Sequence, residues 1–265
     1  PKAPRRRTLR HPTALGLQAL ACAYYGIFAG LMVGYAVLFF AASRKLWRLR
    51  PYWTAVAIAA VTSLLIVAPF FLPYISIQQD EGFRRTIADA ARYSATPASY
   101  LATPAHAHQW IFRIARSLGW SSGEVLFPGL MLIGFGLAGC VLAARRSAGE
   151  PARADSPRET ALLYGSLGLL AFWGSFGPAA GLYTLLFEAI PLFTFLRAPS
   201  RFGLIVAFAL AILAAPAIAG IAARGRRAGV AGVVLAAAAV AELNVLPFPW
   251  ERALPVPSPY PLLGP

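Results

Sequence analysis

The sequence predicts an all-α protein, a polytopic bundle of transmembrane helices with about seven membrane segments. Long uncharged runs alternate with short Arg-rich breaks, hydrophobic residues make up 58% of the 265 residues against 13% charged, and the mean hydropathy is +0.61. A helix rises about 1.5 Å per residue and the hydrocarbon core is about 30 Å thick, so about 20 apolar residues span it. The apolar runs cover residues 13–43, 52–74, 125–144, 161–181, 202–223 and 228–247.

The first run is too long for one span, and we interpret it as a hairpin of two short helices with its apex near residues 22–26. Each arm would have about 15 residues, which is tolerated where protein shields the backbone. A single span would divide the 24 Lys and Arg residues 13 to 11 between the two sides, whereas the hairpin divides them 16 to 8. The positive-inside rule therefore favours the hairpin, with the N-terminus inside and the C-terminus outside. The basic breaks that this topology places on one side are residues 2–10, 44–50, 145–158 and 224–227.

The predicted transmembrane domain covers residues 1–250, and residues 251–265 begin a Pro-rich extracytoplasmic segment. Residues 75–124 form an extracytoplasmic loop and residues 145–160 a cytoplasmic linker. Because the chain begins with Pro1 rather than Met, we expect an interior piece of a larger protein.

The outer loop is expected to hold amphipathic helices that lie at the membrane surface. In residues 106–120, a helix would place its apolar residues on one face and Arg113 and Arg116 on the other. That apolar face consists of Trp110, Ile111, Ile114 and Leu118.

The net charge of +14 does not indicate nucleic-acid binding, because the basic residues lie in the breaks between membrane segments. The lipid bilayer is the partner that the composition predicts. Glycines at positions 26, 30 and 34 have the spacing at which helix backbones approach closely in lipid.

Two short motifs suggest catalysis, and each has a simpler interpretation. Ser121 is the serine of a G-x-S-x-G match, but a nucleophile elbow needs a preceding strand, so we interpret Ser121 and Glu124 as a capping box. His106 and His108 have no Cys or third His nearby, so we expect surface histidines and no metal site.

Glu242 is the one carboxylate within an apolar run, where an ionisable group is expensive unless it is paired or functional. Arg201 begins the preceding run on the same side, and Arg197 lies just before it. We therefore predict that Glu242 pairs with Arg201 or, failing that, with Arg197; a catalytic or transport role is the alternative. Arginine also suits bidentate contact with phosphate, so these two arginines are candidates to bind a lipid-linked phosphate.

Four segments together resemble bacterial multi-pass membrane glycosyltransferases of the GT-C type, loosely along most of the chain. They are LGLQALACAYYGIFAG, RYSATPASYLATPAH, FTFLRAPSRFG and ELNVLPFPWERALPVPSPYPLL. The resemblance implies a protein of the bacterial cytoplasmic membrane that transfers a sugar from a polyprenyl-phosphate donor to an extracytoplasmic acceptor. It places the acidic catalytic motif in a first outer loop upstream of these residues, so the catalytic base stays unknown.

The same resemblance implies binding residues. Those near the lipid-phosphate pocket are Tyr24, Tyr25, Arg197 and Arg201. Asp80 and Glu81 begin the outer loop and are weak candidates for contacts with the acceptor. The implied reaction is direct displacement at the anomeric carbon, with Arg or a divalent metal on the leaving phosphate; the residues themselves indicate no cofactor. Two other classes stay open: a transporter or flippase, and a non-catalytic membrane scaffold subunit.

Overall fold

The computed structural model describes residues 22–80, 86–120, 123–146, 156–190, 193, 196–222 and 228–247. These segments form helices and contain no strand, in agreement with the all-α prediction. The longer helices are α3 (Ala23–Ser43), α4 (Arg50–Asp80), α7 (Leu130–Arg146), α8 (Pro157–Ser175), α10 (Phe202–Ala222) and α11 (Ala228–Glu242). The shorter ones are η1 (Leu46–Arg48), α5 (Ile87–Arg92), η2 (Pro97–Tyr100), η3 (His106–His108), α6 (Gln109–Ser117), η4 (Gly177–Ala180), α9 (Leu182–Ala189) and η6 (Pro199–Arg201).

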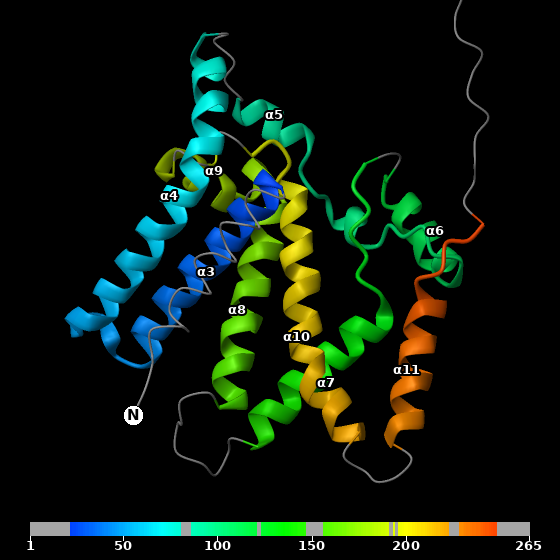
Figure 1. Cartoon of the computed structure of the whole chain (residues 1–265). Helices are drawn as coiled ribbons and strands as arrows, with labels where there is room; N and C mark the ends of the chain where they lie inside the picture. Colours follow the sequence, from blue (N-terminus) through cyan, green and yellow to red (C-terminus); the bar gives the residue numbers. More distant parts are fainter. Residues whose placement is uncertain are drawn as a thin grey trace, which may run out of the picture.

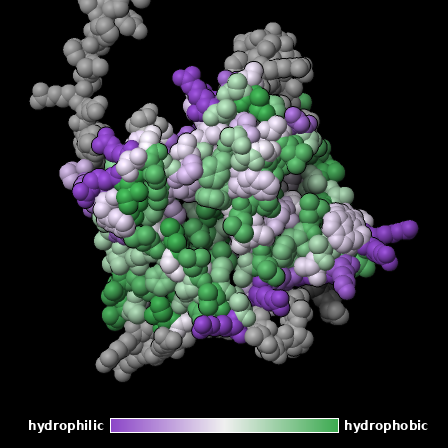
Figure 2. Space-filling model, turned by 180° about the vertical axis from the view of Figure 1, so that it is seen from behind, coloured by the Kyte–Doolittle hydropathy of each residue, from purple (hydrophilic) through white to green (hydrophobic). Residues whose placement is uncertain are grey.

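Three helical segments are long and apolar enough to cross a membrane: Tyr24–Ser43, Arg50–Phe70 and Pro199–Ile221. The span in α4 has none of its residues buried, so its apolar side chains face outward nearly all round. A helix of this kind needs hydrocarbon around it. Figure 2 shows the result, a broad hydrophobic face with hydrophilic residues gathered toward its edges. The chain is therefore an integral membrane protein, while the predicted count of about seven membrane segments is not confirmed.

At one end of the bundle, α3, α7 and α10 end and α4, α8 and α11 begin (Figure 1). Three of the four basic breaks follow these helix ends in the sequence, so we call this the basic end. Arg44 Nη2 lies 2.7 Å from Glu159 Oε2, and the Ser43 hydroxyl donates to Glu159 over 3.0 Å. These contacts tie the α3–α4 connection to the first turn of α8. The grouping of basic breaks follows the prediction, whereas residues 2–10 lie outside the described segments.

The opposite, loop-rich end holds the described residues 86–120, 123–128, 176–190, 193, 196–200 and 243–247, together with the start of α3 (Figure 1). Helix α3 has 21 residues, so the second arm of the predicted hairpin is a full-length span rather than a short arm of about 15 residues. It ends only where Lys45 adopts a left-handed backbone conformation with φ of 55°. The first arm lies outside the described segments.

Two helix ends beside the predicted outer loop differ from the ends of the apolar runs. Helix α4 continues to Asp80 rather than ending near residue 74, and α7 begins at Leu130 rather than at Val125. The predicted capping box therefore does not begin α7, and Ser121 lies outside the described segments.

The surface helix predicted for residues 106–120 is present as η3 and α6. Its inward face differs from the predicted one, because Ile111 and Ala115 are buried while Trp110, Ile114 and Leu118 are exposed. Apolar side chains at these exposed positions suit an interfacial location, so only Ile111 of the predicted apolar face packs on the protein.

Helix α10 stands at the centre of the bundle between α7 and α8 (Figure 1). Its closest approach is to α7, where a Cβ added to Gly139 would lie 1.7 Å from the carbonyl oxygen of Leu213. A Cβ on Gly30 or Gly34 of α3 would meet no atom of the described segments within 4 Å. Among the described helices, the close approach of α7 and α10 therefore depends on Gly139.

Candidate functional site

The loop-rich end brings four residues together from three parts of the chain, and we call them the arginine–tyrosine site: Tyr24, Tyr93, Arg197 and Arg201. The guanidinium carbon of Arg201 lies 4.2 Å from the ring centroid of Tyr24, at the start of α3. The guanidinium carbon of Arg197 lies 4.0 Å from the ring centroid of Tyr93, and Arg197 also donates to the Tyr93 hydroxyl. Cation–π contacts of this kind fix the direction of a guanidinium without neutralising its charge.

Backbone contacts hold this arrangement in place. The Tyr183 hydroxyl donates to the carbonyl oxygen of Leu196 over 2.9 Å, directly before Arg197. The amide of Ser200 donates to the carbonyl oxygen of Tyr93 over 3.2 Å, which joins η6 to the segment that bears Tyr93. Burial and, to a smaller extent, the charge of Tyr24 together raise the pKa of Tyr183 to about 12. Tyr183 therefore keeps its proton at neutral pH and acts as a donor, not as a base.

Neither arginine of the site forms an ion pair with a carboxylate anywhere in the described segments. Arg197 is half-buried and Arg201 is exposed, and each offers N–H donors that an anion can accept. Ser200 lies between them in the sequence and is fully buried. Its hydroxyl oxygen has no hydrogen-bond partner in the described segments. The site therefore carries two positive charges and is suited to a phosphate-bearing ligand.

The structure brings together some of the predicted binding residues and leaves others apart. Tyr24 and Arg201 are in contact, as the resemblance implies, but Tyr25 is 48% exposed on α3, and the rings that the two guanidinium groups contact are those of Tyr93 and Tyr24. Asp80 is the last residue of α4, and its side chain lies outside the described part. Glu81 lies outside the described segments altogether.

Glu242 has different partners from those predicted. Its Oε1 accepts from the amide of Leu130 over 2.5 Å and from that of Met131 over 3.1 Å, at the first two positions of α7. The same oxygen lies 3.1 Å from Nε2 of His108. The predicted ion pair between Glu242 and an arginine is therefore wrong. The carboxylate instead satisfies amides that an α-helix leaves without partners at its N-terminus, where a negative charge also suits the helix dipole.

A glycine allows the carboxylate to approach this closely. Gly129 precedes α7 with φ of 99°, a conformation that other residues rarely adopt. A Cβ at this position would lie 3.3 Å from Leu243 Cδ2 and 3.4 Å from Glu242 Oε2. We call Glu242, His108 and the first turn of α7 the Glu242 joint, since it ties α11, η3 and α7 together.

His108 is buried, which corrects the expectation of a surface histidine. Its ring makes an edge contact with Phe127 at 4.9 Å between centroids, and its Nδ1 has no hydrogen-bond partner. His106 remains exposed at the surface. Within the described segments, His, Cys, Asp and Glu side chains form no group of three, so no metal centre can be built from them.

No role was predicted for Tyr93 or Tyr183, and His108 was expected at the surface. Tyr93 lies in the segment RYSATPASYLATPAH that carries part of the resemblance, and this was the one signal available for it. His108 and Tyr183 have no such signal, because their partners are 134 and 13 residues away in the chain. The chain matches no known protein family, no curated protein and no solved structure. The resemblance to GT-C glycosyltransferases therefore stays a prediction.

Proposed function

We propose that this chain is part of a membrane-embedded glycosyltransferase of the GT-C type, which transfers a sugar from a polyprenyl-phosphate donor to an extracytoplasmic acceptor. The observation that carries the proposal is the pair of arginines without carboxylate partners in the described segments, at one end of a transmembrane bundle. A lipid-linked phosphate reaches such a place from the bilayer, with its chain among the helices and its phosphate at their ends.

In the proposed reaction, a hydroxyl of the acceptor attacks the anomeric carbon of the sugar and forms the new glycosidic bond. The bond from that carbon to the phosphate oxygen breaks, and the polyprenyl phosphate leaves with the electron pair. Arg197 and Arg201 would stabilise the charge on this leaving group through their N–H donors. The proton of the acceptor passes to a base that we do not assign. Glu242 is a poor candidate for it, since its carboxylate is held by two amides and His108.

Binding of polyprenyl phosphate to the full chain in detergent tests the phosphate site, with polyprenol of the same length as the uncharged comparison. We expect the wild-type protein to bind polyprenyl phosphate more tightly than polyprenol. In the Arg197→Gln/Arg201→Gln variant the ratio of the two affinities should fall more than about tenfold, because two charged hydrogen-bond donors are removed. The matched control is Arg113→Gln/Arg116→Gln, which removes the same charge from exposed positions on α6. An unchanged preference in the first variant would contradict the proposal.

The reaction class needs a second measurement on the same protein reconstituted in vesicles. Transfer of labelled sugar from a polyprenyl-phosphate donor to an acceptor supports the glycosyltransferase. Movement of the intact donor between leaflets without transfer would indicate the transporter or flippase, and binding with neither outcome would indicate a scaffold subunit.

A further inference from the structure

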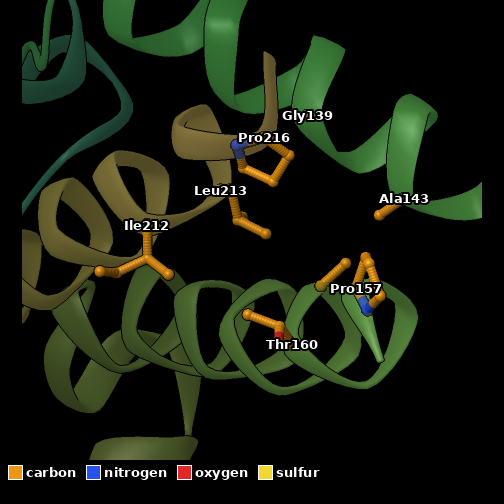
Figure 3. Close-up of a pocket in the computed structure, with 8 residues that line it drawn as sticks. Gly139, Ala143, Pro157, Thr160, Ile212, Leu213 and Pro216 are labelled. Carbon is orange, nitrogen blue, oxygen red and sulfur yellow. The ribbon is translucent and has the colours of Figure 1, made fainter. Parts of the chain in front are cut away.

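A cavity of about 220 Å³ lies near the basic end, where α7, α8 and α10 diverge. Figure 3 shows its walls, with Ile212, Leu213 and Pro216 projecting from α10 toward residues of α7 and α8. The residues that line it are Gly139, Ala143, Pro157, Thr160, Ala161, Ile212, Leu213 and Pro216. It is far from the arginine–tyrosine site along the bundle, so it does not depend on the proposed function.

The cavity follows from the way these helices pack. At Gly139 the backbones of α7 and α10 are in contact, and one turn further along α7 the small side chain of Ala143 no longer fills the space. Pro216, inside α10, has no N–H to donate to the carbonyl of Ile212, so one hydrogen bond of the helix is missing at this level. The small residues Gly139 and Ala143 leave the space between α7 and α10 open.

The lining selects an apolar occupant. Apart from Thr160, the cavity is walled by Gly, Ala, Pro, Ile and Leu side chains. The Thr160 hydroxyl is directed to the backbone, since it donates to the carbonyl oxygen of Ser156 over 3.4 Å. A wall without an ionised or unpaired polar side chain suits a hydrocarbon chain rather than a polar solute.

An arginine lies next to the cavity-lining residues of α8 in the sequence. Arg158 follows the lining residue Pro157 directly, lies one turn before Ala161 on α8, and is exposed. Glu159, the carboxylate nearest to it in the chain, is bound by Arg44 at 2.7 Å. Described Lys and Arg residues at this end outnumber described carboxylates, so the electrostatic potential there attracts a negatively charged lipid headgroup.

We propose that this cavity binds an anionic phospholipid of the leaflet at the basic end. One acyl chain enters between α7, α8 and α10, and the headgroup phosphate contacts Arg158. Basic pockets between transmembrane helices are known to select anionic lipids on this physical basis, since charge attraction and burial of the chain add together. The bound lipid would also fill the gap that Pro216 and Ala143 leave in the packing.

Native mass spectrometry of the full chain, equilibrated with phosphatidylglycerol and phosphatidylcholine of identical acyl chains, tests the proposal. We expect the wild-type protein to retain phosphatidylglycerol preferentially. Arg158→Gln should reduce that preference about fivefold, the effect of one arginine near a membrane surface. Arg145→Gln is the matched control: it is exposed at the same end, but it lies two residues beyond Ala143 and so on another face of α7.

A second variant tests the acyl chain rather than the headgroup. Ala161→Leu fills part of the cavity and should lower retention of both lipids about tenfold or more, because each buried methylene contributes about fourfold to binding. Equal retention of the two lipids by the wild-type protein, or an equal effect of Arg158→Gln and Arg145→Gln, would overturn the proposal. So would retention of neither lipid, which would mean that another protein segment fills the cavity. Because Arg158 is exposed, its result does not depend on the packing of Ala161.

Discussion

The Glu242 joint and the arginine–tyrosine site both place charged side chains at the loop-rich end. They differ in whether the charged group has hydrogen-bond partners within the protein. In the joint, one carboxylate oxygen lies within hydrogen-bonding distance of two amides and an imidazole, and only 11% of the Glu242 side chain is exposed. In the arginine–tyrosine site, two guanidinium groups rest on aromatic rings and meet no described carboxylate. The carboxylate of the first site is satisfied by the protein itself, whereas the guanidinium groups of the second still have N–H donors for a ligand.

This difference separates a structural role from a binding role. A buried charge whose hydrogen bonds are all made inside the protein stabilises the fold, and removing it leaves its partners unsatisfied. A charge held in position by an aromatic ring contributes little to the fold but is preorganised for a ligand. Substitutions should therefore affect stability at one site and ligand binding at the other.

The largest expected effect is that of Glu242→Ala. The change leaves the amides of Leu130 and Met131 and the imidazole of His108 without their acceptor, so we expect a loss of about 2–4 kcal/mol in the free energy of unfolding. Glu242→Gln should cost less, since its amide oxygen still accepts one hydrogen bond. Denaturation of the purified protein in detergent, followed by circular dichroism, measures both changes.

Two comparisons sharpen this prediction. Glu188→Gln removes an exposed carboxylate from α9 and should change stability by less than about 0.5 kcal/mol. In a double-mutant cycle, Glu242→Gln and His108→Gln should be non-additive, because the two side chains are in contact. Additive effects would show that His108 is only a neighbour and not part of the joint.

Much of the fold was predictable because the membrane leaves few choices. Uncharged runs of about 20 residues have to cross as helices, since lipid offers no partner for backbone amides. The grouping of basic breaks at one end followed from the same sequence, and the contact of Arg44 with Glu159 agrees with it. Helix ends were less predictable: α7 begins five residues later than expected, where a carboxylate from α11 satisfies its first amides.

The site was predictable only in part, and the reason is the range over which its contacts form. Arg197 and Arg201 were singled out because arginine at a membrane surface suits phosphate, and that chemistry is visible in the sequence. The partner of Glu242 was not, because the predicted topology placed Arg201 and Arg197 on the same side of the membrane as Glu242, while the fold supplies His108 and a helix N-terminus. The predicted topology therefore identified the charged residues but assigned one of them the wrong partner.

An intermediate effect is expected for Tyr183→Phe, which removes a support of the arginine–tyrosine site without touching its charges. Loss of the hydrogen bond to the Leu196 carbonyl should lower the free energy of unfolding by about 1 kcal/mol. The pH dependence gives a second readout. Because the pKa of Tyr183 in the folded protein is about 12, while the pKa of an unfolded tyrosine is near the ordinary 10.0, the free energy of unfolding should fall as the pH rises between these values.

In the Tyr183→Phe variant this alkaline loss of stability should be reduced, since phenylalanine has no proton to release. Denaturation midpoints measured from pH 9 to pH 12 would show it as a flatter dependence on pH, with the range set by the two pKa values. Tyr100→Phe is a useful comparison, because burial also raises the pKa of Tyr100, although its hydroxyl bonds to Ser175 rather than to the segment before Arg197. Equal losses of phosphate binding in both variants would argue against a specific support by Tyr183.

The smallest effect on stability is expected at the two arginines, and it is the most direct test of the comparison. Arg201→Gln and Arg197→Gln should each change the free energy of unfolding by no more than about 1 kcal/mol, the value of an exposed cation–π contact. Combined with Glu242→Gln, Arg201→Gln should be additive, because Glu242 is bound at α7 and Arg201 at Tyr24. A coupling energy above about 1 kcal/mol would instead show that the arginine and the carboxylate interact, and the arginine would then belong to the fold rather than to a ligand.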